Sequence, residues 1–179
     1  MKMRILVFLS VFFPVVSLSL SHAAPAWNPI DAFNVVWDSP SRDSSGSMPI
    51  GNGDIGLNVW VEDRGDLLFY IGKSDAWSEN CQLLKLGRVR VSLDPNPFAS
   101  PGTFRQELRL REGEIVIAAG EGRGRTIVRV WVDANRPVVW VEAESGIPLQ
   151  FRVKYETWRT ERRKMEGSEL FAAYGVTGS

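Results

Sequence analysis

Short runs of alternating hydrophobic and polar residues make up most of the chain beyond residue 54. An alternation of period two is typical of a strand with one buried face, because successive side chains of a strand point to opposite sides. The runs predicted as strands are 55–62, 67–71, 86–93, 104–110, 115–118, 126–132, 138–144 and 149–155. Amphipathic runs of helical length are missing. The predicted fold class is therefore all-β, an antiparallel β-sandwich.

Turn signals separate these runs. The tetrapeptide Asp-Arg-Gly-Asp at 63–66 has a glycine where a left-handed residue is needed, which predicts a hairpin between the first two strands. Gly113 predicts a second hairpin in the same way. The segment 38–53, rich in Ser, Pro and Gly, is predicted to be an entry loop.

Four tryptophans depart from the alternation, since each falls on the side of its predicted strand that carries charges. They are Trp60, Trp131, Trp140 and Trp158. Under one interpretation, loops cover part of the outer face of a large sandwich. Under the other, the tryptophans face a partner, either a second domain or stacked sugar rings.

The first residues read as a cleavable signal peptide. Lys2 and Arg4 precede the apolar run 5–20, and Ser21-His22-Ala23 ends in the small residues that a signal peptidase accepts. Pro14 interrupts the run, which is shorter than the roughly 20 residues of a membrane span, so a permanent anchor is the weaker interpretation. The sequence predicts a leader over 1–23 and a secreted or periplasmic protein with no membrane contact after cleavage.

Composition excludes several kinds of site. The only histidine, His22, lies in the leader, so the mature chain cannot form a Ser-His-Asp triad or a histidine metal site. Cys81 is the sole cysteine, which excludes an intrachain disulfide and a thiolate zinc cluster. The mature net charge is about −2 with no basic run, so we expect no nucleic-acid partner. We also expect no cofactor, and carboxylates remain the main candidate catalytic groups.

The stretch Gly51-Asn-Gly-Asp-Ile-Gly56 matches G-x-G-x-x-G, the dinucleotide-binding fingerprint. That fingerprint requires a strand before it and a helix after it, whose N-terminus holds the pyrophosphate. Here a loop is predicted before it and a strand after it. We interpret the glycines as a tight loop.

The fragments PIGNGDIG at 49–56 and GKSDAWSEN at 72–80 carry a family resemblance. They resemble the N-terminal β-sandwich of six-hairpin glycosidases, and in particular the inverting α-L-fucosidases of glycoside hydrolase family 95. Those enzymes have P-[IL]-G-N-G-x-[IL]-G before a hairpin and N-E-D-x-[LI]-W-S-G after it. The longer pattern at 37–60 is similar to an uncharacterised N-terminal domain of secreted bacterial relatives.

The resemblance implies a supersandwich-like domain over 24–179, incomplete at its C-terminus, that precedes a catalytic (α/α)6 barrel. It implies a non-catalytic module that packs on the barrel and helps to shape a carbohydrate site. The alternative is a free-standing carbohydrate-binding module. The first predicts a flat, continuous tryptophan-bearing face, and the second a groove with aromatic rings among amides and carboxylates. Lys73 and Ser74 depart from the fucosidase pattern, so fucose specificity cannot be carried over.

Five residues are candidates for contact with a sugar or with a barrel domain. They are Asn52, Asp54, Asp75, Trp77 and Glu79. The ends of a hairpin are neighbours, so the residues before its first strand and after its second strand are expected to meet. The three acids are not expected to form an autonomous catalytic pair, because surface acids of this kind usually cap turns.

Overall fold

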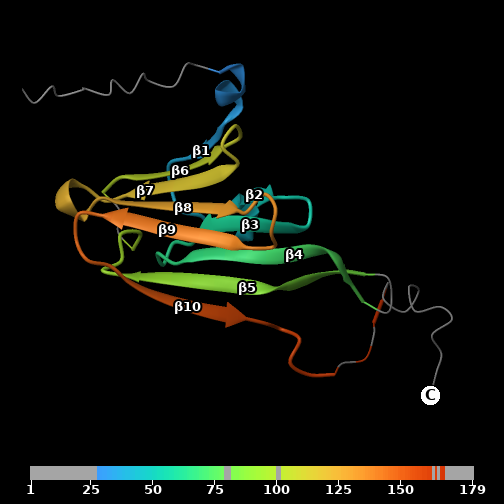
Figure 1. Cartoon of the computed structure of the whole chain (residues 1–179). Helices are drawn as coiled ribbons and strands as arrows, with labels where there is room; N and C mark the ends of the chain where they lie inside the picture. Colours follow the sequence, from blue (N-terminus) through green and yellow to red (C-terminus); the bar gives the residue numbers. More distant parts are fainter. Residues whose placement is uncertain (1–27, 79–81, 100–101, 163, 165, 168–179) are drawn as a thin grey trace, which may run out of the picture.

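The computed structural model describes residues 28–162 except 79–81 and 100–101, together with residues 164, 166 and 167. The predicted leader, Glu79 and Cys81 lie outside these residues. The described chain is all-β, with strands that pair antiparallel in two five-stranded sheets (Figure 1). No helix within these residues is long and apolar enough to span a membrane.

Each sheet combines four strands that are consecutive in the chain with one edge strand from a distant part of the sequence. The first sheet has the order β1 (Val35–Trp37), β6 (Phe104–Arg109), β7 (Glu114–Ala119), β8 (Thr126–Val132), β9 (Val139–Ser145). The second has the order β10 (Gln150–Glu156), β5 (Leu83–Asp94), β4 (Leu67–Trp77), β3 (Ile55–Val61), β2 (Met48–Gly51). Three short 3-10 turns accompany them: η1 (Pro29–Phe33), η2 (Ser44–Gly46) and η3 (Gly122–Gly124).

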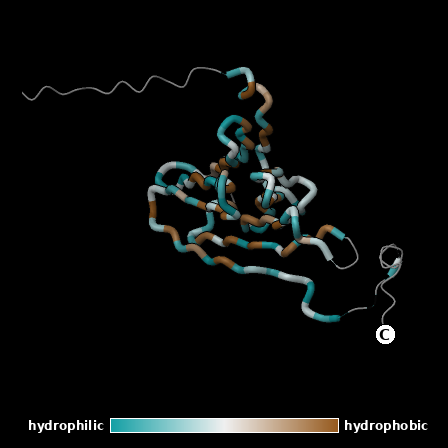
Figure 2. Tube along the Cα trace, turned by 45° about the vertical axis from the view of Figure 1, so that its right-hand side comes forward, coloured by the Kyte–Doolittle hydropathy of each residue, from teal (hydrophilic) through white to brown (hydrophobic). Residues whose placement is uncertain are grey.

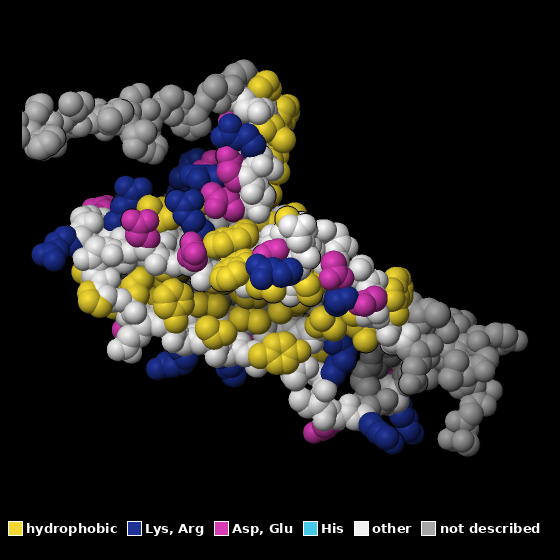
Figure 3. Space-filling view, viewed as in Figure 1, with side chains coloured by type: hydrophobic (Ala, Val, Ile, Leu, Met, Phe, Trp, Pro, Cys, Tyr) yellow, Lys and Arg dark blue, Asp and Glu magenta, His cyan; other side chains and the backbone are white. Residues whose placement is uncertain are grey.

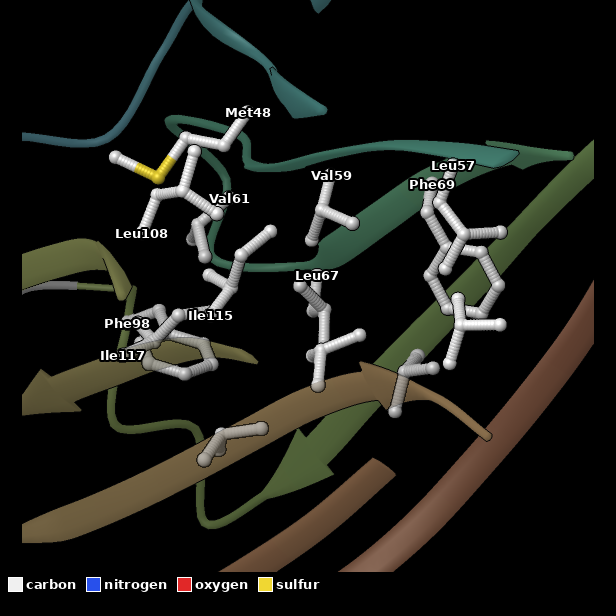
Figure 4. Close-up of a cluster of buried hydrophobic side chains, with 14 of the residues drawn as sticks. Met48, Leu57, Val59, Val61, Leu67, Phe69, Phe98, Leu108, Ile115 and Ile117 are labelled. Atoms are coloured by element: carbon white, nitrogen blue, oxygen red, sulfur yellow. The ribbon is translucent and has the colours of Figure 1, made fainter. Parts of the chain in front are cut away.

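The core lies between the facing sides of the two sheets. Hydrophobic and hydrophilic positions follow one another along the strands (Figure 2). In β3, Leu57 and Val59 are buried while Gly56 and Asn58 are exposed, as the alternation predicts. Ile115 and Ile117 meet them from the first sheet, and Figure 4 shows these side chains in one cluster. The predicted sandwich is therefore confirmed.

The predicted hairpin turn at 63–66 is also confirmed. Gly65 has a φ of 90°, and its N–H donates to the carbonyl of Glu62 at 2.8 Å. A Cβ at this position would lie 2.7 Å from the backbone nitrogen of Ala99. Both the backbone conformation and the packing therefore require glycine here.

Two predicted loops are partly strand. β2 occupies the end of the predicted entry loop, so the glycine motif forms the turn of a β2–β3 hairpin. The absence of a following helix still excludes the dinucleotide fingerprint. β4 continues to Trp77 instead of ending at Ile71, because it remains paired with β5 past two register shifts. Residues 72–77 are mostly polar or small, so the alternation of hydrophobic residues does not predict this part of the strand.

The four tryptophans do not form one continuous face, so the prediction of a flat, continuous tryptophan-bearing surface is wrong. Trp60 is 2% exposed on the outer side of the second sheet. Its ring centre lies 5.1 Å from that of Tyr70, and Trp158 lies edge-on to Tyr70. Trp131 and Trp140 stack at 5.9 Å on the outer side of the first sheet. Coverage of the outer face explains Trp60, whereas Trp140 and Trp158 remain exposed.

An ion-pair network on the outer side of the second sheet ties β10 to β5. Arg90 donates to Glu62, to Asp66 at 2.7 Å and to Glu156 at 3.0 Å, and Arg88 also binds Glu156. Burial works to raise the pKa of Glu156, but the hydrogen bonds from Arg90 and Arg88 outweigh it and the pKa is lowered. The network therefore favours ionised Glu156 in the folded state.

The sandwich is open along the side formed by β9 and β10. Phe151, Val153 and Tyr155 of β10 are 47%, 65% and 57% exposed. Their neighbours in register on β5 are Leu93, Val91 and Val89, of which the first two are buried core residues. Figure 3 shows hydrophobic side chains gathered in a band along this side. The inner surface of the second sheet thus extends past the part that the first sheet covers.

Candidate functional site

The predicted site lies at the end of the second sheet where the β2–β3 turn meets the last residues of β4. The N–H of Ser74 donates to the carbonyl of Asp54 at 2.9 Å, which joins the two segments through their backbones. The predicted neighbourhood of 51–54 and the start of 75–80 is therefore present in the structure.

Lys73 links two of the predicted acids. Its Nζ lies 2.9 Å from Asp54 Oδ1 and 2.7 Å from Asp75 Oδ2. The hydrogen bond from Lys73 lowers the pKa of Asp75, and the hydrogen bonds to Asp75 and then Asp54 raise the pKa of Lys73. The lowered pKa keeps Asp75 ionised at neutral pH, so its carboxyl is not poised to act as a general acid.

Asn52 has a structural role that the sequence did not predict, while its contact with a ligand or a domain stays a prediction. Its amide nitrogen donates to the carbonyls of Asp133 at 2.8 Å and Arg136 at 3.2 Å, in the loop between β8 and β9. Its oxygen accepts from the N–H groups of Asp54 and Ile55, both at 2.9 Å. The side chain thus ties the turn to the other sheet, and its hydrogen-bonding capacity is already used.

Trp77 lies at the end of β4 and is 57% exposed. Its indole N–H donates to the carbonyl of Ser74 at 2.9 Å, which fixes the ring beside the cluster formed by Asp54, Lys73 and Asp75. Ser78 accepts a hydrogen bond from the N–H of Gln82 at 3.2 Å, so it closes the β4–β5 connection. Glu79, the fifth predicted residue, lies outside the described residues.

A groove of about 710 Å³ runs over the outer side of β2, β3 and β4 beside this cluster. Its floor is a row of glycines, since Gly51 registers with Gly56 and Gly56 with Gly72. Lys85 registers with Gly72 at the end of the row. Asp54, Ser74, Asn58 and Tyr70 are also among the lining residues.

Sequence reasoning missed Tyr70 and Lys85 as groove residues. The ammonium of Lys85 lies 4.7 Å from the centre of the Tyr70 ring, within the range of a cation–π contact. The period-two pattern places Tyr70 and Gly72 on one face of β4, which was a usable signal. The β5 residue beside them depends on a register that includes a shift, so the pattern alone could not locate it.

The site offers hydrogen-bonding groups and aromatic surface, and its two described acids, Asp54 and Asp75, share one ion-pair partner, Lys73. Among the described residues, no three His, Cys, Asp or Glu side chains gather as metal ligands. The absence of a cofactor stays a prediction. The arrangement is suited to binding a polar ligand with a flat ring.

Comparison with known proteins identifies the family. Residues 36–177 match DUF5703_N, a domain of unknown function. The chain belongs to this family. The DUF5703_N match runs from the second residue of β1 through β10, and so includes nearly all of both sheets, the groove and the open side. No curated protein matched the chain.

Proposed function

We propose that this DUF5703_N chain is a non-catalytic β-sandwich module of a secreted glycoside hydrolase-like protein. It packs against a barrel domain and helps to shape a carbohydrate site. The fucosidase-like motifs at 49–56 and 72–80 support the relation to glycoside hydrolases.

The observation that carries the proposal is the open side of the sandwich. The alternation in β10 directs Phe151, Val153 and Tyr155 toward the inner side, and Arg152 and Lys154 toward the outer side. The inner three continue the row of core residues on β5 but remain half exposed. Contiguous exposed apolar surface of this kind marks an interaction site, and a packed domain would cover it.

The acids support a non-catalytic role. Hydrolysis of a glycosidic bond requires a protonated acid across a cleft from a second carboxylate. Lys73 holds Asp54 and Asp75 together on one side of the groove, and the lowered pKa of Asp75 opposes protonation. We therefore expect the isolated mature chain to hydrolyse no aryl glycoside. Turnover that disappears in Asp75→Asn would contradict this.

The docking surface can be tested with Val153→Lys. The isolated chain is expected to bind a hydrophobic dye and to self-associate, and the substitution should reduce both without lowering the melting temperature, because Val153 is 65% exposed. The matched control is Phe33→Lys, at an exposed apolar residue of η1 far from β10 in Figure 1. If both variants behave like the original chain, the open side is not a docking surface.

Whether the partner is a barrel domain of the same protein is tested by sequencing the gene beyond the codon for Ser179. A reading frame that continues past Ser179 into an α-helical region supports a barrel in the same protein. A native stop codon directly after Ser179 contradicts it.

A free-standing carbohydrate-binding module is the second candidate, and the groove favours it. A groove with amides, carboxylates and an aromatic ring is the surface expected of such a module. If the isolated chain binds a polysaccharide and no domain docks on β10, this second function is the correct one.

A further inference from the structure

Two glycines in the groove floor have no explanation within the described chain. A Cβ at Gly56 would meet nothing within 4 Å, and a Cβ at Gly72 would meet only the carbonyl of Gly56, at 3.9 Å. Neither residue has a positive φ. Glycine inside a strand weakens it, and one established reason to keep it is the close approach of a ligand or another backbone.

Gly51 provides the contrast. A Cβ there would lie 2.6 Å from the carbonyl oxygen of Ile55, so the β2–β3 turn itself requires glycine. Packing thus accounts for one member of the row, while Gly56 and Gly72 leave open space above the sheet. Together with the volume of about 710 Å³, this makes the floor accessible to a flat group.

The charges around the floor are unequal. At one end, the single ammonium of Lys73 is shared by Asp54 at 2.9 Å and Asp75 at 2.7 Å, which leaves an excess of negative charge there. At the other end, Lys85 has no carboxylate partner among the described residues and contacts only the Tyr70 ring with its ammonium. Within the described chain the groove is therefore polarised: negative charge is in excess at the Asp54 end, and an unpaired positive charge lies at the Lys85 end.

We infer that this groove binds an acidic saccharide, with a sugar ring on the floor of Gly56 and Gly72 and its anionic group on Lys85. The inference rests on the carbohydrate part of the proposed function and adds the location and the charge of the ligand. The CH face of a sugar ring can contact the bare backbone floor. Asn58 and Ser74 supply hydrogen-bonding groups for hydroxyls, and the volume lies in the range of small-ligand sites.

The test is calorimetric titration of the isolated chain with trigalacturonate, a sulfated galactan trisaccharide and neutral galactotriose. We expect binding of at least one acidic probe, weaker binding of the neutral one, and an affinity that falls as salt is added. Lys85→Gln should weaken the acidic probe about tenfold and abolish its advantage over the neutral probe. The matched control is Lys154→Gln, which removes an exposed lysine of β10 outside the groove.

A second variant separates folding from binding. The double substitution Gly56→Ala with Gly72→Ala should keep or raise the melting temperature, because both methyl groups enter open space, and it should abolish binding by filling the floor. The control is Gly124→Ala in η3, where a Cβ also meets nothing within 4 Å.

The outcomes distinguish this inference from the proposed function. Equal binding of acidic and neutral probes, unchanged in Lys85→Gln, overturns the acidic class and leaves the carbohydrate role in place. Binding that survives the double glycine variant overturns the location. Absence of binding by all three saccharides overturns the inference, while docking on β10 is judged separately by Val153→Lys.

Discussion

Asn52 offers the most direct test of how the two sheets are held together. Its side chain makes four hydrogen bonds, two donated to the β8–β9 loop and two accepted from its own turn. Each hydrogen bond contributes about 0.5–1.5 kcal/mol net. Because water can reach part of the turn and replace some of them, Asn52→Ala should lower the free energy of unfolding by about 2–3 kcal/mol.

The assay is urea denaturation followed by tryptophan fluorescence, with the slope of the transition checked for two-state behaviour. The control is Asn58→Ala, at an exposed position of β3. The side-chain amide of Asn58 makes no hydrogen bond within the described part of the chain, so this substitution should change stability by about 0.5 kcal/mol or less. Asn52→Asp adds a pH readout. It keeps the accepting oxygen but places a carboxylate against two carbonyls, which raises the folded-state pKa of the new carboxyl above its unfolded value of about 3.9. The deficit should therefore shrink as pH falls through the folded pKa toward about 4.

A small effect would refute this reasoning. If Asn52→Ala unfolds within about 0.5 kcal/mol of the original chain, the bridge between the sheets is not stabilising. Asn52 would then again be a candidate for ligand contact, as the sequence predicted.

Three further predictions concern stability. Trp77→Ala should change the unfolding free energy by about 0.5 kcal/mol or less, whereas Trp60→Ala should cost about 3–5 kcal/mol, because only Trp60 is buried; equal costs in chemical denaturation would contradict this. The lowered pKa of Glu156 means that its ion pairs stabilise the fold above its unfolded pKa of about 4.3 and lose this effect as pH falls through the folded pKa, so the difference between the original chain and Glu156→Gln should shrink on acidification. Gly65→Ala should cost more than Gly53→Ala, which should cost about 1–2 kcal/mol, because both have a φ of 90° but only Gly65 also lacks space; the reverse order in thermal unfolding would refute the packing argument.

The amino-acid pattern was sufficient to predict the class of fold and several local features. The period-two alternation identified the strands from β3 onward, apart from the last six residues of β4, because most of these strands have one face in a common core. Gly65 marked a tight turn, because few residues other than glycine adopt a φ of 90° readily. The meeting of Asp54 with the segment at Asp75 followed from hairpin geometry alone.

The tertiary structure decided which of these residues are free to bind. Asn52 and Asp54 are close in sequence, yet one bonds to the opposite sheet and the other to Lys73. The register of β5 brings Lys85 to the glycine row, and the offset of the two sheets leaves β10 uncovered. A periodic pattern states which face of a strand is apolar, but coverage and side-chain partners depend on contacts between segments far apart in the chain, and these exist only once the two sheets have packed.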